Sequence, residues 1–187
     1  MTVAAHRFDN ALRYGEADHP RQWHLTPTYV LAAVRQDLGG IIDLDPCTFA
    51  DNPVNAESFY TALDDGLSKP WRWARTVGRV CPTIFVNPPY GKAREPWINH
   101  CLAAAEWGRV ILLVPAATDT RIFQKAASTA TAVVFVRGRV KFGTRRDNRR
   151  QHAASHPSAL IGWNTNLEAC SALGLRVVSN QDSGRDK

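Results

Sequence analysis

The sequence lacks the features that mark several common classes of protein. Its four cysteines, Cys47, Cys81, Cys101 and Cys170, form no CxxC pair, which argues against a zinc ribbon or a disulfide scaffold and favours a reducing, intracellular setting. No apolar run approaches the ~18 residues that indicate a membrane span, and no N-terminal segment has the pattern of a secretion signal. Repeats and low-complexity segments are also missing. We therefore expect a cytoplasmic, globular protein.

The composition is that of one ordinary domain. The chain has 187 residues, of which 44% are hydrophobic and 21% charged, and this is long enough to build a hydrophobic core. The polar residues 1–22 predict an irregular arm, residues 23–178 a single domain, and residues 179–187 a polar tail.

The positive charge is concentrated in one segment. The chain carries 23 Lys and Arg against 17 Asp and Glu, a net charge of +6, and residues 137–151 alone account for +6. Binding to a phosphate backbone requires such a concentration, although a solvated loop would also carry it. We predict that residues 137–156 form a loop that contacts nucleic acid. The candidate contacts are Arg137, Arg139, Lys141, Phe142, Arg145, Arg146, Arg149 and Arg150.

Strands and helices alternate along the chain. Thr26 is the expected N-cap of the first helix, with Pro27 at its first position and Gly39 and Gly40 at its end. Further helices are expected at residues 94–107, 118–129 and 166–173, and strands at 41–45, 58–62, 79–86, 109–116, 132–138 and 157–163. Residues 139–143 read as a hairpin partner or a continuation of the strand before them. The apolar run Val110–Val114 is typical of a strand covered on both faces, so we predict an α/β doubly wound, mostly parallel sheet with an antiparallel C-terminal element.

The stretch Asn87-Pro88-Pro89-Tyr90 follows one of these strands, where ligands bind in such sheets. Neither proline has an N–H group, so the turn presents carbonyl oxygens and the Asn87 amide oxygen but few donors. A cluster of acceptors suits a substrate that is itself a donor, such as a planar NH2 group, and Tyr90 offers a flat face for stacking. A plain turn with a packed tyrosine is the alternative, but we interpret all four residues as catalytic.

The ordered motifs resemble those of a known family. "W-x-L-T-P", "IDLDPC", "DDGL", "VNPPYG", "PAATDT", "GRVKF" and "PSALIGW" follow one another over about residues 23–163. This order resembles the small phage and prophage DNA N6-adenine methyltransferases of the Dam-like group, which use S-adenosylmethionine. The resemblance implies a Rossmann-like methyltransferase fold, double-stranded DNA as the partner, and a bacterial cytoplasm as the location.

The resemblance also assigns roles to residues. Asn87 and Pro88 would accept from the N6 amine, and Tyr90 would stack on an adenine flipped out of the duplex. The activated methyl of S-adenosylmethionine needs no metal, and His152 and His156 lack a carboxylate partner, so no metal site is expected. Residues expected at the cofactor are Trp23, Thr26, Pro27, Asp43, Asp45, Pro46, Cys47, Asp65 and Asn87.

Some points remain open at the level of sequence. The loop after "DPC" contains no glycine, and only about forty residues separate it from "NPPY", so Asp64, Asp65 and the weaker Glu57 all remain candidates for the acid at the ribose. The same acceptor turn would also suit cytosine N4, an RNA base or a protein amide. A decayed methyltransferase that only binds DNA is a further alternative.

Overall fold

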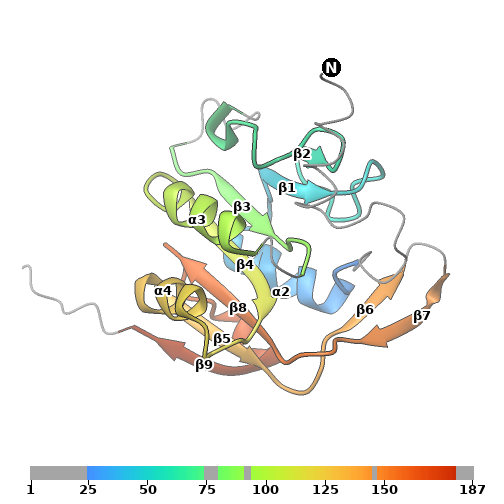
Figure 1. Ribbon diagram of the computed structural model, residues 1–187, viewed down its shortest axis with the longest axis vertical. Helices are drawn as coiled ribbons and strands as arrows, with labels where there is room; N and C mark the ends of the chain where they lie inside the picture. Colours follow the sequence, from blue (N-terminus) through green and yellow to red (C-terminus); the bar gives the residue numbers. More distant parts are fainter. Residues whose placement is uncertain (1–24, 74–79, 91–93, 145–146, 180–187) are drawn as a thin grey trace, which may run out of the picture.

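The computed structural model describes residues 25–73, 80–90, 94–144 and 147–179, apart from the side chains of residues 73 and 144–152 (Figure 1). The predicted arm at residues 1–22 lies outside the described part, as does the tail after residue 179. The helices are α2 (Thr28–Leu38), α3 (Arg94–Ala104) and α4 (Arg121–Thr129), and the short 3-10 helices are η2 (Trp71–Trp73) and η3 (Ala169–Leu173). Among them, none is long and apolar enough to cross a membrane.

Seven strands form the main sheet, in the order β2-β1-β3-β4-β8-β5-β9. They are β1 (Leu44–Thr48), β2 (Ser58–Thr61), β3 (Thr83–Val86), β4 (Arg109–Pro115), β5 (Ala132–Val136), β8 (Ser158–Trp163) and β9 (Gly174–Val178). The pairs β1–β2, β1–β3 and β3–β4 are parallel. The later pairs, β4–β8, β5–β8 and β5–β9, are antiparallel. The predicted α/β sheet with antiparallel C-terminal strands is therefore confirmed.

Helices cover the sheet on both faces (Figure 1). Along β4, Val110 and Leu112 join the cluster that includes α3 and α4, whereas Ile111 and Leu113 join the cluster that includes α2. Successive side chains of a strand point to opposite faces, so an unbroken apolar run supplies both cores. Burial on both faces holds the strand ends in place, and those ends carry the polar motifs.

The helix α2 begins one residue later than its sequence predicts. Pro27 is the N-cap, with an extended backbone, and Thr28 is the first helical residue. Gly39 ends the helix in the left-handed conformation at φ 86°, which glycine adopts without strain. Because Thr26 does not cap the helix, its hydroxyl can bond elsewhere.

The basic segment forms a hairpin, where a loop was predicted. Strands β6 (Lys141–Thr144) and β7 (Asp147–Ala153) pair with each other and form a separate two-stranded sheet. The strand β6 therefore pairs with β7 and does not pair with β5. Val140 and Phe142 are fully buried beneath the hairpin, and this apolar attachment explains how so polar a sequence forms strands.

Candidate active site

The polar motifs meet where the sheet changes direction of winding. The strands β1 and β3 are neighbours, but the chain continues from β1 to β2 on one side and from β3 to β4 on the other. The connections therefore diverge beyond the carboxyl ends of β1 and β3, the position at which open α/β sheets bind ligands. Residues Pro46–Thr48 end β1, and Asn87–Tyr90 follow β3.

Asn87 is held by the segment that precedes α2. Its amide nitrogen donates a hydrogen bond to the hydroxyl of Thr26 at 2.9 Å. This contact fixes the nitrogen of the amide toward Thr26 and turns the amide oxygen away from it. Pro88 is buried and Pro89 is half-buried, so the turn is rigid. The sequence does not reveal this contact, because 61 residues separate the two partners.

Tyr90 packs edge-to-face on Phe142 of β6. The ring centroids are 5.8 Å apart and the ring planes meet at 79°, which is a favourable aromatic geometry. Burial raises the pKa of the Tyr90 hydroxyl well above its ordinary range, so the phenol is neutral. Phe142 is 0% exposed. The prediction that Phe142 contacts DNA is therefore corrected: its apolar ring lies in the core, behind Tyr90.

The strand β1 carries a buried carboxyl group. Asp45 is 2% exposed, and its carboxylate accepts a hydrogen bond from the backbone N–H of Cys47 at 3.1 Å. Burial raises the pKa of Asp45 to about 7, although hydrogen bonds from Cys47 and Thr48 oppose the shift. Burial and the charge of Asp45 also raise the pKa of the Cys47 thiol, whose sulfur lies against the backbone of Asn87. A protonated thiol is a poor nucleophile, so Cys47 contributes shape here.

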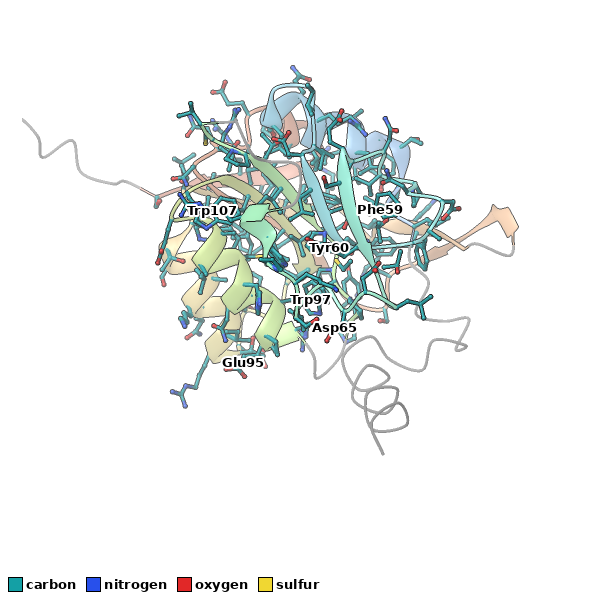
Figure 2. All side chains as sticks on the ribbon, turned by 90° about the horizontal axis from the view of Figure 1, so that it is seen from above. Phe59, Tyr60, Asp65, Glu95, Trp97 and Trp107 are labelled. Atoms are coloured by element: carbon teal, nitrogen blue, oxygen red, sulfur yellow. The ribbon has the colours of Figure 1, made fainter. Side chains whose placement is uncertain are left out.

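The two acids of "DDGL" have different roles. The Asp64 carboxylate accepts from the backbone N–H and the hydroxyl of Thr61 at 2.8 and 2.7 Å, which lowers its pKa and closes a turn. Asp65 is 3% exposed and lies next to Gly66, and Figure 2 shows it in the same region as Trp97. Of the two, only Asp65 is buried. Glu57, exposed at the start of β2, lies at the opposite end of the strand.

Gly66 brings that loop against β1. A Cβ atom at this position would lie 1.9 Å from the carbonyl oxygen of Pro46 and 3.4 Å from the Trp97 ring. The indole nitrogen of Trp71 donates to the Gly66 carbonyl at 2.8 Å and holds the loop from the other side. Trp71 is not among the site residues predicted from the sequence. The only sequence signal for this packed loop is Gly66, the glycine that follows the two acids.

Asp43 is not part of this site. Its carboxylate accepts from the backbone N–H of Thr83 at 2.8 Å and lies 2.9 Å from the Thr83 hydroxyl. Thr83 begins β3, whereas Asn87 follows its last residue, a separation of roughly 13 Å along a strand. Asp43 therefore ties the residue before β1 to the start of β3, at the opposite end of the strand from Asn87, and the structure does not bring it to the predicted cofactor contacts.

The predicted basic contacts are described only in part. Arg137, Arg139 and Lys141 are exposed on the approach to the hairpin, and the Arg139 guanidinium donates to the carbonyl of Ser155. Trp23, Arg145 and Arg146 lie outside the described residues, as do the side chains of Arg149 and Arg150. The strand β6 reaches the site through Gly143, which exchanges two backbone hydrogen bonds with Leu25 at 3.0 and 3.2 Å. No group of three His, Cys, Asp or Glu side chains that could hold a metal occurs within the described ranges.

Comparison with known proteins agrees with this geometry. A model of the family described as DNA N-6-adenine-methyltransferase (Dam) matches residues 16–186, which is nearly the whole chain. A comparison with curated proteins finds no matching sequence. The chain belongs to the Dam family of DNA N6-adenine methyltransferases, and it is an enzyme that methylates adenine in DNA.

Proposed function

We propose that this enzyme transfers a methyl group from S-adenosylmethionine to the N6 amine of an adenine that is flipped out of double-stranded DNA. The observation that carries the proposal is the Asn87 amide, which Thr26 holds at 2.9 Å within a turn of two prolines beside Tyr90. This turn follows β3, at the point where the connections of β1 and β3 diverge.

The turn is suited to the chemistry of an aromatic amine. The N6 group has two hydrogens, and the Asn87 amide oxygen and the Pro88 carbonyl can accept one each. Accepting both hydrogens draws the nitrogen lone pair out of conjugation with the ring and stabilises the positive charge that develops on nitrogen. Tyr90 stacks on the base. Flipping is required because N6 is paired inside a duplex and cannot meet a methyl donor in line.

The residues of β1 fit a cationic cofactor. A buried carboxyl group that titrates near pH 7, such as that of Asp45, is stabilised in its charged form by a nearby cation. The residues that would hold S-adenosylmethionine are Thr26, Pro27, Asp45, Pro46, Cys47 and Asp65, with Trp23 and Asn87 as further predicted contacts. The cofactor supplies an activated methyl group on a sulfonium sulfur. The protein positions the two reactants and excludes water.

The exposed cations before the hairpin fit the DNA backbone. Arg137 and Lys141 are exposed on the chain that leads into β6, and β6 is joined to the site through Gly143 and Leu25. Phosphate contacts would fix the position of the duplex while the turn acts on one base.

A labelled-methyl assay followed by nucleoside mass spectrometry tests the proposal. Wild-type protein with S-adenosylmethionine and duplex DNA should yield N6-methyladenine. The variant Asn87→Ala should lower kcat by at least about 10²-fold, since it removes an acceptor that acts on the developing charge, while it leaves cofactor affinity within a few-fold of wild type. The control is Asn99→Ala, an exposed asparagine on α3, which should keep wild-type activity. Full activity of Asn87→Ala would contradict the mechanism, and N4-methylcytosine as the product would contradict the substrate.

A further inference from the structure

Four residues outside the Asn-Pro-Pro-Tyr turn hold both of its ends. Thr26 accepts from the Asn87 amide at 2.9 Å, and Phe142 packs on the edge of Tyr90 with the ring centroids 5.8 Å apart. The neighbours of these two residues, Leu25 and Gly143, are joined by two backbone hydrogen bonds. The contacts therefore form a closed circuit, called here the contact ring. It runs from Asn87 through Thr26, Leu25, Gly143, Phe142 and Tyr90 and back along the two prolines.

The contact ring brings together three distant parts of the chain. Leu25 and Thr26 precede α2, the turn follows β3, and Phe142 and Gly143 belong to β6 of the basic hairpin. The contact between Leu25 and Gly143 is an isolated bridge outside the named strands, and Phe142 is fully buried. A short bridge beside a buried ring can transmit a displacement, because a packed core shifts as a unit.

We propose that Leu25, Thr26, Phe142 and Gly143 form a clamp that positions the catalytic turn and couples it to the basic hairpin. This inference rests on the proposed function for its catalytic readout. Thr26 sets the orientation of the Asn87 amide, and Phe142 sets the ring plane of Tyr90. A displacement of the hairpin, such as one caused by bound DNA, reaches Thr26 and Phe142 through the Leu25–Gly143 bridge. Thr26 and Phe142 are positioning residues, because they act through Asn87 and Tyr90.

The kinetic test uses two pairs of variants at saturating S-adenosylmethionine. Thr26→Val removes the hydroxyl and should lower kcat about tenfold or more, as small misplacements of a catalytic group do. Thr26→Ser keeps the hydroxyl and should have the kcat of wild type. Phe142→Leu should also lower kcat. The controls are Thr131→Val, which removes a hydroxyl that accepts from the Asn164 backbone, and Phe123→Leu, which makes the same change in a buried residue of α4. A residue that only contacted the cofactor would raise KM for S-adenosylmethionine and leave kcat at saturation intact.

The coupling has a second readout that does not depend on activity. In the NMR spectrum of the protein alone, the side-chain NH2 signals of Asn87, identified by their loss in Asn87→Ala, should shift in Thr26→Val. They should also shift in Phe142→Leu, because Gly143, Leu25 and Thr26 link Phe142 to Asn87. Phe123→Leu should leave them in place.

The clamp is overturned if Phe142→Leu leaves the Asn87 signals unmoved, if both variants keep kcat within twofold of wild type, or if Thr26→Ser is as impaired as Thr26→Val. If wild-type protein methylates no adenine, the proposed function fails instead. The NMR shifts alone then decide whether the clamp exists.

Discussion

At the scale of single residues, Asp45 links the protonation of the site to the stability of the fold. Burial raises its pKa from the ordinary 3.8 to about 7. A carboxyl group whose pKa is higher in the folded state gives its full stabilisation below the unfolded value, and this is lost as the pH rises through about 7. The loss is of the order of 4 kcal/mol at most, since one pKa unit corresponds to about 1.4 kcal/mol. Asparagine at this position does not titrate.

We therefore predict that Asp45→Asn is stabilised relative to wild type at pH 8 and less so at pH 5. Urea unfolding of both proteins at the two pH values measures the difference. The same variant should bind S-adenosylmethionine more weakly at pH 8, since it lacks the anion that faces the proposed cation. A stability difference that is the same at pH 5 and pH 8 would show that Asp45 is not buried as an acid in the folded protein.

At the scale of elements, the sequence predicts the strands that are apolar throughout. It misses the strands whose pairing depends on a few contacts with residues distant along the chain. The strands β3, β4, β5 and β8 are found because their continuous apolar runs are typical of strands covered on both faces. The sequence predicts residues 139–143 as a hairpin partner or a continuation of the strand before them, and β7 as a loop. The pairing of β6 with β7 is missed because charge dominates the segment and its burial depends on Val140 and Phe142. The strand β9 is missed as well. Its exposed residues Leu175 and Val177 give no sign of which neighbour pairs with them.

The site shows the same division. The acceptor turn and the buried Asp45 follow from motifs, whereas the bond between Thr26 and Asn87 depends on how α2 packs beside β3. The sequence places Asp43 two residues before Asp45, but Asp43 precedes β1 and binds Thr83 at the start of β3, whereas Asn87 follows the end of β3. Spacing along the chain cannot distinguish these cases.

The packing of one loop against β1 gives a prediction at the same scale. Gly66→Ala would place a methyl group 1.9 Å from the Pro46 carbonyl oxygen, so the loop or the end of β1 must move. We expect a loss of about 1–3 kcal/mol in the free energy of unfolding, as for other overpacked sites, together with a higher Kd for S-adenosylmethionine. Thermal unfolding and calorimetry measure the two effects.

A matched control for this prediction is Gly138→Ala. It adds a methyl group with no atom within 4 Å, at a residue with φ of +70°, so it introduces backbone strain of about 1–2 kcal/mol without a clash. Its affinity for the cofactor should equal that of wild type. Equal cofactor affinity of Gly66→Ala and wild type would mean that the loop does not shape the site.

At the scale of the whole molecule, the net positive charge is concentrated in one segment of the chain. Residues 137–151 account for the net charge of +6, and the rest of the chain is neutral. The exposed Arg137 and Lys141 belong to this segment, whereas the exposed Arg121 and Lys125 lie on α4, against one face of the main sheet. Replacing either pair of cations with glutamine lowers the net charge by the same amount. Any difference in DNA binding between the two double variants therefore results from the position of the cations.

We predict that the double variant Arg137→Gln with Lys141→Gln binds duplex DNA more weakly and with a smaller dependence on salt. Each lost phosphate contact lowers the slope of log Kd against log salt by about 0.9, so the slope should fall by about 2. Fluorescence anisotropy at several salt concentrations measures it, and the control variant Arg121→Gln with Lys125→Gln should keep the wild-type slope. Equal slopes for the two double variants would mean that DNA is attracted by net charge alone. A lower slope for Arg137→Gln with Lys141→Gln alone would mean that the duplex lies along β6, the strand whose Phe142 packs on Tyr90.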